Sequence, residues 1–366
     1  MACYHPLKAW PIGLTASGKT DYKITSYLVH HLEMRNGIWY TCNTDYLSPY
    51  REKSVVEFTE IPCGKCVGCR LEYSRQWANR CMLELEYHKS AYFVTLTYNN
   101  EHVPRSYYAD PETGEVQQSL TLRKRDFQLF MKRLRKRFCD YDKTRVDTCS
   151  SSVGNLRSDC IRFFAAGEYG SQTYRPHYHA ILFGLNLNDL ILYKKSCGFS
   201  YFYSPELQKC WSVTESGVLS PLGFCLVAPV SWETCAYTAR YVMKKLTGPE
   251  SDFYTTFNIE PPFTLMSRKP GIAHQWYVDH PDCFNYEYIN ISTENGGRKF
   301  RPPKYYEKLF EIDCPETSAE LKATRKRMAE EAKKIKLSKT SLSYLDYLQV
   351  EEDALNDRIK SLERKL

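Results

Sequence analysis

The sequence predicts an α+β fold in which helices pack on an antiparallel sheet. Short aromatic and apolar runs bounded by Gly or Pro recur at 91–98, 163–170, 175–184 and 223–230, and such runs are typical of strands. Segments 71–88, 123–138 and 232–246 instead carry apolar residues at helical spacing. Because strands and helices do not alternate regularly, we expect an antiparallel sheet with helices on one face. Segment 103–119 is expected to be a loop.

Composition narrows the class of protein. Lys and Arg exceed Asp and Glu by seven among the 366 residues, a balance that suits a polyanionic partner. The fifteen cysteines are an odd number, and no apolar signal segment precedes them. Both features favour a reducing compartment over a disulfide framework. No apolar run approaches the length needed to span a membrane, so we expect a soluble protein of the cytoplasm.

The stretch from Gly13 to Thr20 matches the phosphate-binding P-loop pattern. A P-loop needs a buried strand before it and a helix after it, so that backbone amides and the helix N-terminus point at the phosphates. Only twelve residues precede Gly13, and Pro6 and Pro11 interrupt them. We therefore predict a solvent-exposed turn and no nucleotide site.

Cys63, Cys66 and Cys69 form two overlapping Cys-x-x-Cys turns. In a reducing compartment such turns are typical of zinc ligands, and a closed tetrahedral site needs a fourth. Cys3, His5 and Cys42 are the candidates for that ligand. An iron–sulfur cluster and plain reduced cysteines are the alternatives to structural Zn²⁺.

A strongly basic helix is predicted over 123–138. Its apolar residues repeat at helical spacing, so one face is core, and eight of the residues from Arg123 to Arg137 are Lys or Arg. This density of one charge repels itself unless an anion lies nearby. We expect the outer face to contact DNA phosphates through Arg123, Lys124, Lys132, Arg133 and Lys136. A solvated face is the alternative.

The arms 163–170 and 175–184 predict a β-hairpin that carries a metal site. Successive side chains of a strand point to opposite faces, so His177 and His179 share one face. In an antiparallel pair, Glu168 comes back close to His177. Two histidines and one carboxylate form a metal site with open positions for a substrate. The alternative is a pair of polar residues on a sheet face.

Residues 232–246 are predicted to form one helix. Ser231 is its N-cap, and Gly248 with Pro249 follows its end. Tyr237 and Tyr241 are four residues apart and lie on one face, with Lys244 continuing that face. Half-buried packing of the tyrosines is the alternative. Thr95 and Thr97 of segment 91–98 share a face, and we assign them to sheet packing rather than to DNA contact.

Three segments together resemble a known family. Phe93-Val94-Thr95-Leu96-Thr97-Tyr98, then Gly167-Glu168 with Pro176-His177-Tyr178-His179, then Tyr237-x-x-x-Tyr241-x-x-Lys244 stand in the order of the HUH endonuclease motifs. The whole chain resembles the replication initiation proteins of the Microviridae, small single-stranded DNA bacteriophages, and most of all their gokushovirus branch. The N-terminal Cys3-Tyr4-His5-Pro6 is a looser match, and it favours Cys3 as the fourth zinc ligand.

The resemblance implies a rolling-circle replication initiator in the bacterial host cytoplasm. Mg²⁺ or Mn²⁺ on Glu168, His177 and His179 would orient a phosphate of single-stranded or melted origin DNA. Tyr237 or Tyr241 would then attack it, leaving a 5′-phosphotyrosine and a 3′-hydroxyl primer, and the strands would later be rejoined. Lys244 would assist as a neighbouring cation. A host helicase and polymerase are the implied partners.

Four regions are expected along the chain. They are an N-terminal region with the zinc knuckle (1–88), the nickase core (89–248), an irregular accessory segment (249–316) and a helical tail (317–366). Three other functions stay open. The chain could be a plasmid or transposon enzyme of the same superfamily, a zinc-knuckle nucleic-acid-binding protein without catalysis, or a two-His, one-carboxylate iron oxygenase.

Overall fold

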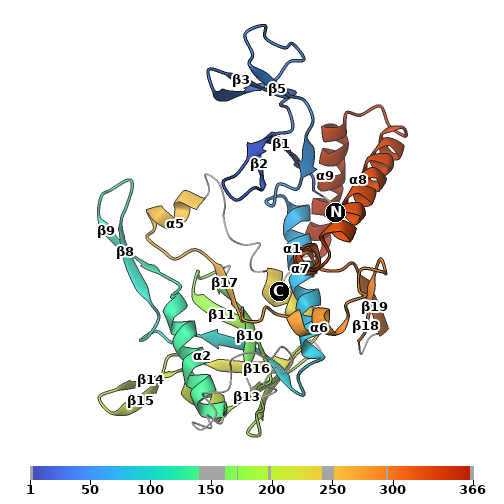
Figure 1. Ribbon diagram of the computed structural model, residues 1–366. Coiled ribbons are helices and arrows are strands. Elements are labelled where there is room, and N and C mark those ends of the chain that lie inside the picture. The colour runs from blue at the N-terminus through green and yellow to red at the C-terminus, as the bar shows by residue number, and fades with distance from the viewer. Residues whose placement is uncertain are drawn as a thin grey trace. The chain divides into compact units, whose positions relative to one another are not determined.

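A computed structural model of the chain describes residues 3–139, 161–170, 172–196, 199–240, 251–293 and 296–362 (Figure 1). The chain divides into two compact units, which are described separately. One unit comprises residues 73–318, and the other combines residues 1–72 with 319–366. The fold is mixed α+β with antiparallel sheets, as the sequence predicts. The four-region division stays a prediction.

A seven-stranded sheet organises the unit 73–318. Its strand order is β12-β13-β16-β7-β11-β10-β17, and every neighbouring pair is antiparallel. The predicted strands at 91–98, 163–170, 175–184 and 223–230 are confirmed as β7, β10, β11 and β16. The seven strands are β7 (Ala91–Thr97), β10 (Arg162–Tyr169), β11 (Pro176–Phe183), β12 (Ile191–Ser196), β13 (Phe199–Tyr203), β16 (Cys225–Pro229) and β17 (Phe263–Met266).

Helices cover both faces of this sheet, so the expectation that they cover one face is wrong. Phe93, Phe164 and Ile181 pack with residues of α1 (Val67–Leu85) and α4 (Trp232–Arg240); we call this side the α1 face. Leu96 and Tyr178 pack on the opposite side, the α2 face, with α2 (Lys124–Phe138) and α3 (Pro205–Cys210). The physical reason is that the central strands are apolar at successive positions, and such strands need cover on both sides.

The expected loop at 103–119 is instead a hairpin of β8 (Arg105–Ala109) and β9 (Val116–Leu120). Asp110 closes the turn, because its Oδ1 accepts hydrogen bonds from the backbone N–H groups of Glu112 and Thr113. Gly114 supplies the positive φ of 72°. A second small hairpin is formed by β14 (Ser212–Glu215) and β15 (Val218–Pro221).

The remainder of this unit lies in the segment that the sequence left irregular. Besides β17, it contains α5 (Asp252–Thr256), α6 (His274–Asp279), β18 (Ile289–Thr293), β19 (Gly296–Phe300) and α7 (Lys304–Asp313). The buried carboxylate of Glu84 on α1 ties this segment to the core. It accepts a hydrogen bond of 2.6 Å from the Ala273 backbone N–H and forms an ion pair with Arg162.

The P-loop-like stretch is confirmed as a solvent-exposed turn. It connects β1 (Leu7–Leu14) to β2 (Thr20–Ser26), and these two strands pair antiparallel. The Gly18 backbone has a φ of 76°, and every residue from Gly13 to Thr20 is exposed. No helix follows the turn in this described region, so the amides lack the arrangement that phosphate binding requires.

The second unit contains two small sheets, of order β2-β1-β6 and β4-β3-β5. The tail is helical as predicted, and Lys333 of α8 donates a 2.9 Å hydrogen bond to Glu60. None of the described helices is both long and apolar enough to cross a membrane. The remaining elements are β3 (His31–Arg35), β4 (Ile38–Cys42), β5 (Lys53–Val55), β6 (Thr59–Ile61), α8 (Pro315–Leu337) and α9 (Tyr344–Leu362).

Candidate active site

The β10–β11 hairpin brings Glu168, His177 and His179 together. Glu168 lies directly opposite His177 in the antiparallel register, which is the pairing that the sequence predicts. The Nε2 atoms of His177 and His179 approach the Glu168 Oε1 to 2.7 and 3.1 Å. One ligand atom from each residue lies within 4.8 Å of the others. The three side chains therefore converge on one point of the α1 face.

The outer nitrogen of each imidazole also has a partner. The His177 Nδ1 lies 3.1 Å from the Arg175 carbonyl oxygen, and the His179 Nδ1 lies 3.0 Å from the Thr95 Oγ1. An Nδ1–H that donates to a carbonyl leaves the Nε2 lone pair directed toward the centre of the site. These contacts orient both rings as metal ligands require.

Burial leaves the site open on one side only. The exposed fractions of Glu168 and His179 are 1% and 5%, whereas the His177 side chain keeps 20% of its surface. The ring of Phe93 lies against His179, with centroids 5.5 Å apart and planes at 9°. This stacking restricts the His179 ring, so a ligand would enter from the side of His177.

Helix α4 places Tyr237 beside this cluster. Its first turn is capped reciprocally, because the Thr234 N–H donates to the Ser231 Oγ and the Ser231 N–H donates to the Thr234 Oγ1. The buried side of α4 packs into the α1-face core. The Tyr237 ring centroid lies 5.2 Å from that of His179, with planes at 77°, and 44% of Tyr237 is exposed. A tyrosine that solvent reaches thus lies next to the histidines.

The predicted helix 232–246 is described only as far as Arg240. Tyr241 and Lys244 lie outside the described residues, so their predicted positions on the Tyr237 face are not compared with the site.

Two contributors, Thr95 and Phe93, were missed by the sequence analysis, which assigned Thr95 to sheet packing. Both lie on β7, where Thr95 pairs with His179 and Phe93 with Ile181. Residues opposite each other in an antiparallel pair project from the same face. The alternation of Phe93, Thr95 and Thr97 was visible in the sequence, but the adjacency of β7 and β11 was not.

A second cluster joins Cys3, Cys63, Cys66 and Cys69 in the other unit. One Sγ from each lies within 4.8 Å of the others, and the Cys63 and Cys69 Sγ atoms are 4.0 Å apart. Tetrahedral Zn–S bonds of about 2.3 Å place neighbouring sulfurs about 3.8 Å apart. The four thiols could therefore bind Zn²⁺. Of the other candidates for the fourth ligand, His5 instead contacts Glu352 at 2.6 Å.

Backbone amides support the thiolate form of these cysteines. The N–H groups of Lys65 and Cys66 donate to the Cys63 Sγ at 3.4 and 3.3 Å, and the Tyr4 N–H donates to the Cys66 Sγ at 3.4 Å. Burial alone would raise the pKa of Cys66, but hydrogen bonds from the Cys69 and Tyr4 amides lower the pKa to about 7. Burial raises the pKa of Cys3 to about 11.

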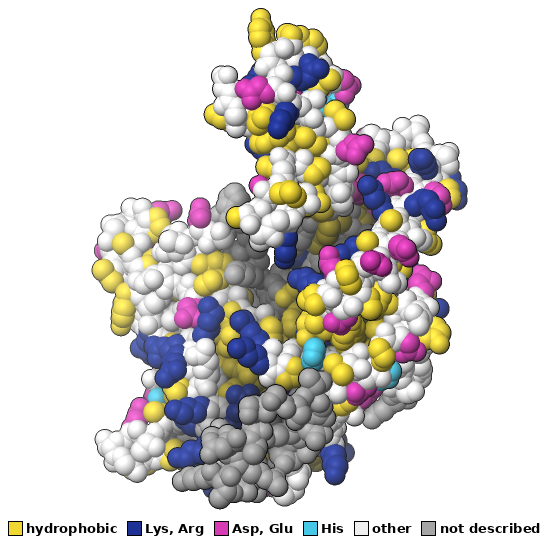
Figure 2. Space-filling view, in the orientation of Figure 1, with side chains coloured by type: hydrophobic (Ala, Val, Ile, Leu, Met, Phe, Trp, Pro, Cys, Tyr) yellow, Lys and Arg dark blue, Asp and Glu magenta, His cyan; other side chains and the backbone are white. Residues whose placement is uncertain are grey.

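The basic helix α2 lies on the sheet face opposite the histidines. Figure 2 shows Lys and Arg side chains gathered over this helix. Arg123, Lys124, Lys132 and Lys136 are exposed, whereas the Arg133 guanidinium is partly buried and donates to the Cys210 carbonyl oxygen at 3.1 Å. The five predicted phosphate contacts are therefore not equivalent, because Arg133 already has a protein partner.

Comparison with known proteins supplies the family. Residues 91–246, which span β7 to the tyrosine segment, match the family model of the replication-associated protein ORF2. A replication-associated protein ORF2 of Spiroplasma virus 4 is 28% identical over 371 aligned residues, covering 100% of this chain and 98% of that protein. The chain belongs to the replication-associated protein ORF2 family. The matched residues contain the Glu168–His177–His179 cluster and Tyr237.

Other members of the family extend this similarity. The replication-associated protein VP4 of Bdellovibrio phage phiMH2K is 26% identical over 340 residues, covering 88% of this chain and 94% of that protein. The replication-associated protein ORF4 of Chlamydia phage 1 is 26% identical over 190 residues, covering 50% of this chain and 38% of that protein. No solved structure matches this family member.

Proposed function

We propose that this chain initiates rolling-circle replication of a single-stranded DNA phage by nicking its origin. The observation that carries the proposal is the 5.2 Å approach of the Tyr237 ring to His179, beside the buried Glu168 carboxylate. A nucleophile, two imidazoles and an acid converge where solvent has access. The membership in a replication-associated family supports the same conclusion.

The residues Glu168, His177 and His179 fit a divalent cation. Two imidazole nitrogens and a carboxylate oxygen converge, and each ring has the Nδ1 partner that metal-binding histidines usually have. We assign Mg²⁺ or Mn²⁺ to this site, where the ion would polarise a phosphate oxygen and neutralise its developing charge. The cysteine cluster is assigned a structural Zn²⁺ with Cys3 as the fourth ligand.

The chain itself supplies the nucleophile. The phenol oxygen of Tyr237 or Tyr241 attacks the phosphorus of one phosphodiester, and the bond from phosphorus to the 3′ oxygen breaks. The 5′ phosphate stays on the tyrosine, while the phenol loses its proton and the 3′ oxygen gains one. Because a free tyrosine has a pKa of about 10, a nearby cation favours its ionisation, and Lys244 is assigned that role.

The same exchange runs in reverse and rejoins strands. One phosphodiester is replaced by another, so the bond energy is kept in the tyrosine linkage. Two tyrosines allow one to hold the first 5′ end while the other cuts the regenerated origin. The products are a circular single strand and a 3′-hydroxyl primer for a host polymerase. A host helicase is the assigned source of the unwound strand.

Helix α2 is assigned to the DNA flanking the cut. Because it lies on the face opposite the histidines, Arg123, Lys124, Lys132 and Lys136 would hold a distant part of the strand by phosphate contacts, which carry little sequence information. Arg133 would contribute less, because its guanidinium is bonded to Cys210.

The proposed function is tested by incubating the full chain with Mn²⁺ and single-stranded origin DNA labelled 3′ of the cut. We expect a labelled protein–DNA adduct that survives denaturant, and no adduct in EDTA. Binding without an adduct would contradict nicking and favour the non-catalytic zinc-knuckle protein. Oxidation of a small substrate with Fe²⁺ would favour the oxygenase.

Thr95→Val is expected to weaken Mn²⁺ binding by about 10- to 100-fold, the usual effect of removing a hydrogen-bond partner of a ligating histidine. Titration calorimetry measures the affinity, and Thr95→Ser should restore it. Thr97→Val is the matched control, because the Thr97 hydroxyl bonds the Phe224 backbone instead of a histidine. Equal affinities for Thr95→Val and wild type would contradict the assigned role of the Thr95 contact.

A further inference from the structure

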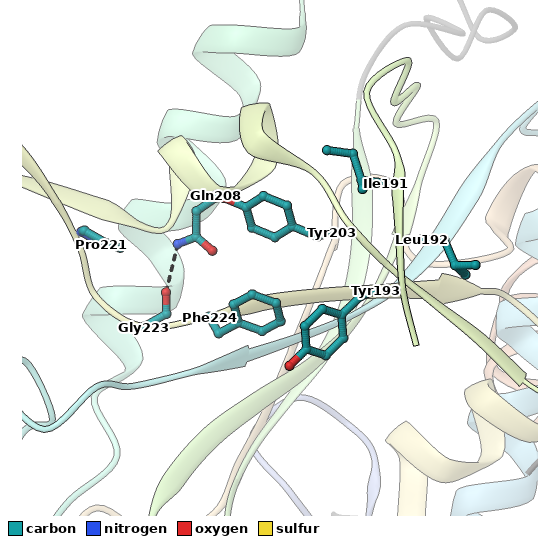
Figure 3. A pocket seen from close by; sticks show the side chains of 8 residues that line it. All are labelled: Ile191, Leu192, Tyr193, Tyr203, Gln208, Pro221, Gly223 and Phe224. Atoms are coloured by element: carbon teal, nitrogen blue, oxygen red, sulfur yellow. Dashed lines mark hydrogen bonds between the residues drawn. The ribbon is translucent and has the colours of Figure 1, made fainter. Parts of the chain in front are cut away.

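An aromatic pocket lies at the free edge of the seven-stranded sheet, apart from the histidine cluster (Figure 3). It has a volume of about 360 Å³ and is lined by Tyr193, Tyr203, Phe224, Ile191 and Gln208 among others. The edge strand β12 is exposed at all six positions. Exposed apolar side chains gathered at one place are typical of a binding site.

Three rings form the pocket. The Tyr203 and Phe224 rings are stacked, with centroids 5.5 Å apart and planes at 10°. The Tyr193 ring lies 5.1 Å from Phe224 at 47°. Solvent reaches 58% of Tyr193 and 36% of Phe224. The Gln208 side chain anchors the start of β16, donating to the Gly223 carbonyl and accepting from the Cys225 N–H, so Phe224 is held on a rigid backbone.

The charge of this edge is positive. Strands β12, β13 and β16 contain Lys194 and Lys195 and no acidic residue. The Lys194 Nζ lies 5.4 Å from the Tyr201 ring centroid. Aromatic faces interleaved with lysines suit a single-stranded nucleic acid, whose bases stack while its phosphates are neutralised. An apolar protein partner has less use for the lysines.

The pocket is continuous with the proposed cutting site. Cys225 and Val227 point into the α2-face core, so Phe224 projects from the α1 face by alternation, as His177 does. Thr97 connects them: its N–H donates to the Phe224 carbonyl at 3.0 Å, and it pairs with His177 on the other side. Two strand spacings are about 10 Å, the length of about three stacked nucleotides.

We propose that Tyr193, Tyr203 and Phe224 form a stacking platform for unpaired bases of the strand that is cut. Lys194 and Lys195 neutralise the neighbouring phosphates. The platform rests on the proposed function, because it gives the single strand a path from the sheet edge to the histidines. It holds the strand by stacking, which tolerates different base sequences.

The test measures binding of fluorescent oligo(dT) to the full chain in EDTA, where nicking is absent. Tyr193→Ala and Phe224→Ala are each expected to weaken binding about 5- to 150-fold, the equivalent of 1–3 kcal/mol per stacked base. Tyr286→Ala is the matched control, because Tyr286 is similarly exposed but lies outside the pocket. Tyr193→Trp should keep the affinity, and its added fluorescence should be quenched by oligo(dT) more than by duplex DNA.

Affinities of Tyr193→Ala and Phe224→Ala equal to that of Tyr286→Ala would overturn the platform. So would self-association of the wild type that these variants abolish, because the pocket would then be a protein interface. If the wild type forms the covalent adduct but the pocket variants bind normally, the platform fails and nicking stands. If the variants lose binding but the wild type forms no adduct, nicking fails and the platform stands.

Discussion

The Tyr237→Phe, Tyr241→Phe double variant is expected to form no covalent adduct with origin DNA, a loss on the order of 10³-fold or more. Phenylalanine keeps the ring that lies 5.2 Å from His179 but lacks the attacking oxygen. The two single variants should keep part of the activity, because either phenol can attack. Denaturing electrophoresis of the labelled DNA measures the adduct, and calorimetry should show unchanged Mn²⁺ affinity.

The control for this loss is Tyr286→Phe, which removes an exposed phenol away from the site and should leave adduct formation unchanged. Single-stranded DNA binding by the double variant should also stay near wild type, which separates lost chemistry from lost folding. An adduct that persists in the double variant would mean that another residue is the nucleophile.

Cys66→Ser is expected to remove the zinc and to unfold the region around it. Cys66 and Cys69 are buried with Tyr4 and Leu348 in one apolar cluster, so the metal would fasten the N-terminus and residues 63–69 to α9. Structural zinc contributes its binding free energy to folding. Metal analysis should fall from about one zinc per chain to almost none, and proteolysis should cut residues 1–72 first.

Cys42→Ser is the matched control in the same unit. Cys42 was a candidate fourth ligand, but it lies outside the cluster of Cys3 and its three partners, so its loss should leave the zinc content unchanged. Zinc that survives Cys66→Ser, or that disappears with Cys42→Ser, would contradict the assigned ligand set. Iron and inorganic sulfide in the purified protein would instead identify an iron–sulfur cluster.

The local part of the site was predictable from the sequence. The spacing of His177 and His179 defines their shared face, and the short loop after Glu168 determines the antiparallel register. The cap at Ser231 and the apolar spacing after it predict the helix that carries Tyr237. These features depend on residues close in the chain, where the geometry of strands and helices has few solutions.

The remaining features depend on contacts between distant segments. Thr95 and Phe93 support His179 only because β7 lies beside β11, and strand order is not encoded in a local pattern. Helices cover both sheet faces because several strands are buried on both sides. The β8–β9 hairpin was read as a loop because its strands carry polar residues at most positions, which weakens the strand signal.

The most direct measurement of the central claim is identification of the residue that becomes attached to DNA. The adduct formed with Mn²⁺ is digested with protease and nuclease, and the modified peptide is sequenced by mass spectrometry. We predict a 5′-phosphonucleotide on the phenol oxygen of Tyr237 or Tyr241. Attachment to any other residue, or a nick that leaves both ends free of protein, would contradict the account.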